Sequence, residues 1–345
     1  MSATAMSATA VSAPLRRLVA AGREQVMGAT RDLFSHGDHP LAHTLSYRGD
    51  PGLFGPDSMT WPVVGDAAVF VGGIRALLVQ AAHPEVAAGV SEHSRYREDP
   101  LGRLTRTASF VTSTAFGAMP EVDAAIDTVQ RRHRPVTGVS ARGCPYNASD
   151  PDLAAWVHNT LTDSFLVAYR VFGPGACSDA DADRYVAEQT LVGARLGASP
   201  LPDTADRLAA WVADHPALAP SPAAAEAIAF LRDPPLPVAV RIPYLVLLRA
   251  AAATLPSRVA GIVGVRSLPG DLEVGRVAVA ALRWSLGASP DWRVALERVG
   301  APPPGGVTFR QGIPPAAVAK VERPARRISC GRRRSPGRAG GPGGK

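Results

Sequence analysis

Residues 150–172 constrain the fold of this chain more than any other segment. Asp150 followed by Pro151 is a strong helix start, because aspartate caps free backbone N–H groups and proline suits the first helical position. Apolar residues then recur at helical spacing and mark one face of a helix. These residues are Leu153, Trp156, Val157, Leu161, Phe165 and Phe172. The segment therefore predicts a long amphipathic helix that packs against other helices.

His158 lies on this helix, one turn before Leu161 and Thr162 and two turns before Phe165. That spacing places its side chain toward the buried side of the helix. A buried imidazole must be hydrogen-bonded, or bound to a metal through one ring nitrogen. The helix pattern leaves both readings open, a satisfied core histidine and a metal ligand.

The composition favours a helical fold for the whole chain. Of the 345 residues, 46% are apolar and only 6% are aromatic, so the core consists largely of Ala, Val and Leu. Such a core suits close-packed helices better than a β-sandwich. We expect an all-α protein with a single helical domain over residues 14–300. Residues 1–13 and the Pro/Gly/Arg-rich residues 301–345 are expected to be disordered.

Cap residues and prolines predict where the other helices lie. The expected helices are 14–34, 66–82, 84–92, 99–116, 120–133, 179–196, 204–214, 222–231, 243–254, a short one near Arg258, and 273–286. No convincing alternating strand pattern is present, and residues 134–149 are expected to form a loop.

The positive charge of the chain is concentrated in its tail. The formal net charge is +7, but residues 320–345 hold nine Lys or Arg and one acidic residue, a net +8. The first 319 residues are therefore close to neutral, at −1. A role in nucleic-acid binding would rest on the tail alone, and we expect a solvated extension rather than a specific nucleic-acid partner.

Cysteine content and apolar runs indicate the compartment. The three cysteines, Cys144, Cys177 and Cys330, form no close metal-type pair and imply no disulfide framework. The longest apolar stretch, 242–256, contains Arg249 and is too short to span a bilayer. Residues 16–17 are a pair of arginines, but no apolar export segment follows them. We expect a cytoplasmic protein without a membrane span.

The predicted helix at 99–116 carries a second informative pattern. Arg103 and Thr107 are four residues apart and share a helix face, which continues through Phe110 and Thr114. An arginine on an inward face needs an anion, either a carboxylate of the protein or one that belongs to a ligand. The sequence leaves a structural ion pair and a ligand contact open.

The remaining histidines give weaker indications. His83 precedes a proline and is expected at a helix end, where it would interact with terminal carbonyls. His93 is expected either to face a pocket or to be exposed, and His36, His39 and His43 are expected in a solvated loop. No zinc-protease, phosphate-loop, dinucleotide-binding or nucleophile-elbow motif is present, so common hydrolase and NTPase functions lack support.

Four motifs in a fixed order make the sequence recognisable. They are Gly-Pro-Asp-Ser at 55–58 with Trp61, Gln-x-x-His-Pro-x-Val-Ala-Ala-Gly-Val at 80–90 with His-Ser at 93–94, Asp-Pro-x-Gly-Arg-Leu-x-Arg-Thr at 99–107, and Asp-Pro-x-Leu-x-x-Trp-Val-His-x-Thr-Leu-x-Asp-Ser at 150–164. In this order and spacing the chain resembles the family of rubber oxygenases (latex-clearing proteins) and MpaB-type oxygenases. The resemblance is concentrated in residues 50–175 and continues more weakly to about 290.

The resemblance implies an all-helical, globin-like core that holds a b-type haem. It makes His158 the proximal iron ligand, and it makes Arg103 and Thr107 the pair that lines the haem pocket as cofactor-binding and catalytic residues. This agrees with elementary chemistry, because imidazole suits iron and a guanidinium can pair with a haem propionate.

The chain departs from the best-known members of the family at two places. They carry a lysine just before the threonine as a second axial ligand, where this chain has Arg106, a poor ligand because it stays protonated. The stretch that matches their catalytic glutamate reads Val86-Ala87-Ala88. We therefore expect an open or water-bound distal iron site and no cleavage of rubber itself.

The resemblance predicts a haem-dependent oxygenase that acts with O2 on a small apolar substrate, such as an alkene or a terpenoid. The alternative is a non-catalytic haem protein, a sensor or carrier, because a fold and a ligand do not guarantee turnover. The sequence does not indicate an oligomeric state.

Overall fold

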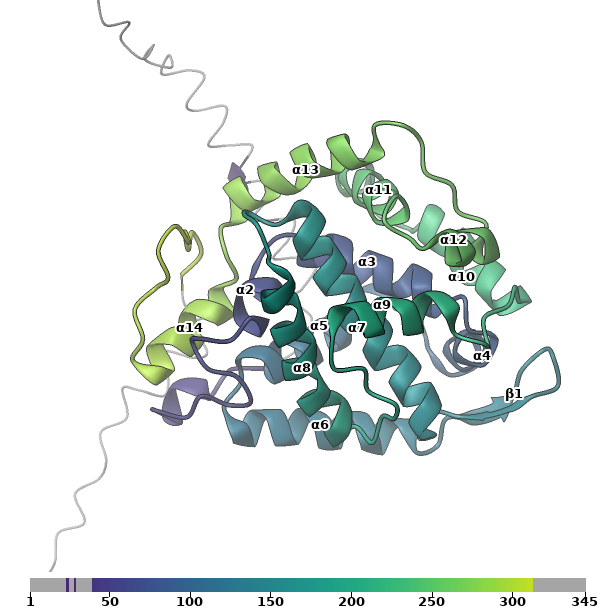
Figure 1. Cartoon of the computed structure of the whole chain (residues 1–345), viewed down its shortest axis with the longest axis horizontal. Helices are drawn as coiled ribbons and strands as arrows, with labels where there is room; N and C mark the ends of the chain where they lie inside the picture. The colour runs from purple at the N-terminus through teal and green to yellow at the C-terminus, as the bar shows by residue number, and fades with distance from the viewer. Residues whose placement is uncertain (1–22, 25–27, 29–38, 313–345) are drawn as a thin grey trace, which may run out of the picture.

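Thirteen α-helices make up most of the computed structural model, which describes residues 23–24, 28 and 39–312 (Figure 1). In this part of the chain the only sheet is a small antiparallel pair, β1 (Thr137–Val139) and β2 (Pro145–Asn147). The all-α class predicted from the composition is confirmed. The predicted N-terminal extension 1–13, most of the helix 14–34 and the tail from 313 onward lie outside the described residues.

Most helices begin at the cap and proline signals that the sequence carries. In chain order, the helices are the 3-10 helix η1 (Thr44–Ser46), α2 (Thr60–Gly65), α3 (Val69–Gln80), α4 (Pro84–His93), α5 (Pro100–Phe116), α6 (Met119–His133), α7 (Pro151–Phe172), α8 (Asp179–Arg195), α9 (Ala205–Asp214), α10 (Pro222–Arg232), α11 (Val238–Ala252), α12 (Ser257–Val263), α13 (Asp271–Leu286) and α14 (Pro290–Val299).

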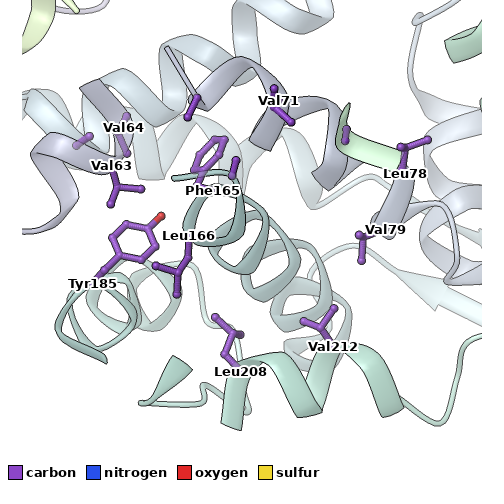
Figure 2. Packing of buried hydrophobic residues seen from close by; sticks show 14 of the residues in the cluster. Val63, Val64, Val71, Leu78, Val79, Phe165, Leu166, Tyr185, Leu208 and Val212 are labelled. Carbon is purple, nitrogen blue, oxygen red and sulfur yellow. The ribbon is translucent and has the colours of Figure 1, made fainter. Parts of the chain in front are cut away.

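Helix α7 is the central element of the fold. It packs along α3 on one side and against α8 and α9 on the other; α11 lies beyond α3, and α13 packs on α11 and also on α7 (Figure 1). Figure 2 shows Phe165 and Leu166 leaving α7 toward different layers, Phe165 toward Val71 of α3 and Leu166 toward Leu208 of α9. Because neighbours surround α7, it buries polar residues as well as apolar ones.

The face that α7 buries differs in one respect from the predicted apolar face. Val157 is 37% exposed, whereas the polar residues Asp163 and Ser164 are buried. The reason is a buried arginine on α3: Arg75 donates from Nη1 to Asp163 at 2.6 Å and to Ser164 at 2.8 Å. These bonds fix the rotation of α7, so that its polar stripe faces α3.

A glycine allows this close packing of α3 on α7. A Cβ atom at Gly72 would lie 2.6 Å from the ring of Phe165 and 3.1 Å from the carbonyl oxygen of Ser164. The first distance is too short for a Cβ atom and the second is tighter than most real contacts, so a side chain here would push α3 and Phe165 apart.

The structure corrects the sequence prediction at several elements. The expected loop 134–149 contains the β1–β2 hairpin, and α2 and α14 were not predicted. Helix α14 carried a signal, since Ser289 caps the N–H of Asp291 and Pro290 is its first residue. Helix α11 begins before the predicted start and contains Pro243.

The chain after α14 stays packed on the fold as far as it is described. Phe309 forms an isolated bridge with Gly287, and its ring packs edge-on against Trp292. Among the described helices, none combines the length and the apolar character that crossing a bilayer requires.

Candidate functional site around His158

His158 is buried, with 6% of its surface exposed, and its ring points from α7 toward α8. The Nε2 atom lies 2.9 Å from the carbonyl oxygen of Gln189. A carbonyl only accepts hydrogen bonds, so Nε2 carries the hydrogen and donates it. Burial lowers the pKa of His158 to about 4, which keeps the imidazole neutral near pH 7. The lone pair of the neutral ring is therefore on Nδ1.

A cavity lies beside this imidazole, between α2, α5, α7 and α8. Its volume is about 350 Å³, including its opening to solvent. The enclosed space that the centre of a water-sized sphere can reach is only about 20 Å³, so the cavity in this structure is far smaller than ligand pockets of roughly 300–1,000 Å³. Apolar side chains that line it include Val64, Phe110, Leu161, Phe165 and Val192.

The threonines of the cavity do not add free polar groups. Thr114 donates from its hydroxyl to the carbonyl of Phe110, and Thr162 donates to the carbonyl of His158, each within its own helix. Such bonds satisfy the hydroxyl locally. The cavity is therefore apolar in character, with the imidazole as its most basic group.

The structure divides the stripe of four residues that was predicted to share one face of α5, namely Arg103, Thr107, Phe110 and Thr114. Phe110 and Thr114 line the cavity with His158, whereas Arg103 and Thr107 do not. Since residues three and four apart share a helix face, Arg103 and Thr107 lie on the continuation of the cavity wall, toward the start of α5. The structure thus brings together His158 and the second half of the stripe.

Arg103 lacks an acidic partner. It is half-buried and donates from Nη1 to the hydroxyl of Ser94 at 2.6 Å. Within the described ranges no carboxylate lies at ion-pair distance from Arg103, and burial lowers the pKa of its guanidinium. The structural ion pair considered from the sequence is therefore not formed among these residues. Thr107 is exposed and donates to the carbonyl of Arg103 at 3.2 Å.

The two positions where the chain departs from the family it resembles lie away from the cavity. Arg106 is exposed and pairs with Asp99, with 3.2 Å between Nη1 and Oδ2. Ala87 and Ala88 are buried in α4. The nearby carboxylate of Glu85 does not line the cavity, since it is bound by Arg142 of the hairpin.

The other histidines have structural contacts. His83 is the cap residue at the start of α4 rather than a helix-end residue; it is 4% exposed and packs against the ring of Trp156. His93 is exposed and its Nε2 lies 3.1 Å from the carbonyl of Thr137. His39 pairs with Asp291. In the part of the chain that the structure describes, no cluster of three His, Cys, Asp or Glu side chains could hold a metal ion.

Sequence reasoning missed the α2 and α8 walls of the site. Thr60, Val64 and Gln189 line the cavity, and none of them stood out in the sequence. Gly193, inside α8, carried a signal that could have been used, because an isolated glycine within a helix often has a packing reason.

The structure defines an all-helical protein in which a neutral, buried imidazole borders an apolar cavity. Residues 61–284 match the family described as "ER-bound oxygenase mpaB/B'/Rubber oxygenase, catalytic domain". This range includes nearly all of α2 and the whole of α5, α7 and α8, which form the cavity. The chain belongs to this oxygenase family, as its four motifs indicated. No curated protein and no solved structure matches the chain.

Proposed function

We propose that the protein is a haem b-dependent oxygenase that uses O2 on a small apolar substrate, such as an alkene or a terpenoid. The observation that carries this proposal is the neutral imidazole of His158, hydrogen-bonded at Nε2 and bordering an apolar cavity. When bound, haem iron supplies the activation of O2, and the protein supplies ligation, polarity and access.

The chemistry of His158 fits an axial iron ligand. A metal binds the neutral ring at a nitrogen with a free lone pair, and the depressed pKa keeps that pair free of a proton. Histidines that bind metals almost always donate their other N–H to a carbonyl, a carboxylate or a water, and the carbonyl of Gln189 provides such an acceptor. In this role the Gln189 carbonyl of α8 holds the His158 ring in one orientation.

Arg103 fits the acidic groups of the same cofactor. A half-buried guanidinium without a carboxylate favours an anion, and haem carries two propionates. The hydroxyl of nearby Tyr96 is also buried and has no hydrogen-bond partner among the described residues. Arg103 would hold the propionates, and Thr107 lies one turn further along α5, on the side of Phe110.

The walls of the cavity favour an apolar substrate. Val64, Phe110 and Leu161 offer no hydrogen-bonding side-chain atoms. The hydroxyls of Thr114 and Thr162 bond within their own helices, and that of Thr60 bonds to α8. A polar substrate would lose its hydration there without replacement. An alkene loses little hydration free energy on burial, so an apolar cavity favours it over a polar substrate.

The absorbance spectrum of protein purified from haem-supplemented cells tests this proposal. We expect a Soret band with the wild-type protein, its loss with His158→Ala, and O2 uptake when alkenes or terpenoids are added. Colourless, iron-free wild-type protein would contradict the proposal. A Soret band without O2 uptake on any alkene would instead identify the non-catalytic haem protein.

A further inference from the structure

The wall of α8 that faces His158 is bare of side chain at Gly193. A Cβ atom at this position would lie 2.8 Å from Cδ2 and 3.0 Å from Nε2 of the His158 ring. The first distance is shorter than real Cβ contacts and the second is tighter than most of them, so a Cβ atom at position 193 would have to displace the ring. The imidazole therefore lies directly against the backbone of α8.

The same stretch of α8 supplies the acceptor for the ring. Gln189, one turn before Gly193, accepts the Nε2 hydrogen bond of His158 at its carbonyl oxygen. Its side-chain amide donates to the hydroxyl of Thr60 at 2.9 Å. Gln189 is thus bound at both its backbone and its side chain.

The neighbouring residue ties this part of α8 to α2. The carboxylate of Glu188 accepts from the backbone N–H of Met59 at 3.0 Å, from the N–H of Thr60 at 2.8 Å and from the Thr60 hydroxyl at 2.7 Å. Three bonds from one carboxylate fix the spacing of the two helices. The peptide that faces His158 therefore has little freedom to move.

We infer that Gly193 is a positioning residue for the cofactor: it lets the imidazole of His158 lie against α8 and bond to the Gln189 carbonyl in one orientation. This inference rests on the proposed function, because it assigns the orientation to iron ligation. Gly193 itself contacts neither iron nor substrate.

A packing role alone is the competing explanation. The hypothetical Cβ at position 193 would also meet Cδ2 of Leu201 at 2.5 Å. That methyl group is the end of a flexible side chain and can turn away. The imidazole is less free, because α7 lies on one side of it and the Gln189 carbonyl on the other.

The first test is a haem titration of the haem-free Gly193→Ala variant. We expect its affinity for haem to fall roughly 10–100-fold, the range for disturbed support of a metal ligand. Gly73→Ala is the matched control, because Gly73 also lies inside a helix and a Cβ there meets no atom within 4 Å. Its haem affinity should stay within about twofold of wild type, and circular dichroism should show both variants folded.

The double variant Gly193→Ala/Leu201→Ala separates positioning from packing. It removes the contact with Leu201 and leaves the contact with the imidazole, so the loss of haem affinity should persist. Full recovery of the affinity in the double variant would overturn the inference, as would unchanged affinity in Gly193→Ala.

A measurement on the haem-free protein keeps this test independent of the proposed function. Long-range ¹H–¹⁵N NMR reports which ring nitrogen carries the hydrogen. We expect the Nε2–H tautomer for His158 in the wild type and in Gly73→Ala, and a loss of this tautomer's dominance in Gly193→Ala. If the wild type binds no haem but shows this pattern, the proposed function fails and the positioning of the ring by Gly193 remains. An unchanged tautomer in Gly193→Ala overturns the inference even when haem binds.

Discussion

Two buried histidines, His158 and His83, look alike in their titration and differ in their surroundings. Burial lowers the pKa of each to about 4, and each exposes less than a tenth of its surface. His158 donates to a backbone carbonyl and borders a cavity. His83 packs against the rings of Trp156 and His215, which also contact each other, and its Nδ1 lies 3.4 Å from the carboxylate of Glu85. Burial and a depressed pKa therefore do not distinguish a metal-binding histidine from one that only packs. The cavity beside the ring does distinguish them.

The largest effect on haem content should come from replacing each of the two histidines separately. His158→Gly should abolish the Soret band, because it removes the axial ligand, and added imidazole should restore the band by entering the vacated space. His83→Phe keeps an aromatic ring beside Trp156 and should retain the full haem content. Absorbance at equal protein concentration, with and without imidazole, measures both outcomes. Loss of haem in His83→Phe with normal circular dichroism would show that we have assigned the wrong histidine.

A pH series should isolate the structural role of His83. Its pKa is about 4 in the folded protein and 6.5 when unperturbed, so the unfolded chain takes up the proton first as the pH falls. His83 should therefore contribute a fall of about 3 kcal/mol in the free energy of unfolding between about pH 7.5 and pH 4, and His158, whose pKa is also about 4, should contribute a similar fall.

Urea unfolding of the wild type and His83→Phe between pH 4 and pH 8 measures this contribution. The variant should lose about half of this slope below pH 6.5, because His158 still titrates, while the curves of the two proteins run parallel above pH 7. An equal slope in both proteins below pH 6.5 would mean that His83 does not titrate as its burial requires.

The helices around both histidines could largely be predicted from local signals. Asp150-Pro151 and Asp99-Pro100 mark helix starts that the structure places within one residue, because caps and proline act on their own segment. Asp99 caps the N–H of Gly102, whereas the expected cap bond of the Asp150 side chain is not formed. The hairpin at 137–147 could not be predicted this way. It is bound by tertiary contacts, among them the bond from Tyr146 to Glu92 and the bonds from Arg142 to Glu85.

The candidate site could be predicted only in part for the same reason. Helical spacing placed His158 on a buried face, and this holds. The spacing did not reveal the α8 wall, because the meeting of Gln189 and Gly193 with α7 depends on how two helices pack. Helical spacing also could not show that the cavity wall on α5 includes Phe110 but ends before Thr107.

The comparison extends from the histidines to the arginines near them. Beside His83, Arg142 forms a closed ion pair with Glu85, donating from Nε at 2.6 Å. Near the His158 cavity, Arg103 donates to the hydroxyl of Ser94 and has no carboxylate partner among the described residues. We predict that Arg103→Gln lowers haem affinity about tenfold or more, because a hydrogen bond to a charged group contributes roughly 1.5–3 kcal/mol.

The control for this change is the same substitution one turn along α5. Arg106 is exposed and already paired with Asp99, so Arg106→Gln should change haem affinity by about twofold or less. Titration of both haem-free variants with haem measures the two effects. Equal losses in both variants would indicate a general attraction of haem anions to positive charge instead of a site at Arg103.

The smallest effect is expected at Thr107. Its hydroxyl is exposed and donates to the carbonyl of Arg103, within its own helix. Thr107→Val keeps the size of the side chain and removes this bond, so haem affinity should change by about two- to threefold and stability by roughly 0.5 kcal/mol or less. Haem titration and urea unfolding of this variant measure both quantities. A loss of tenfold or more at unchanged stability would mean that α5 turns Thr107 into the cavity when haem binds, so that the cavity wall extends along the whole stripe.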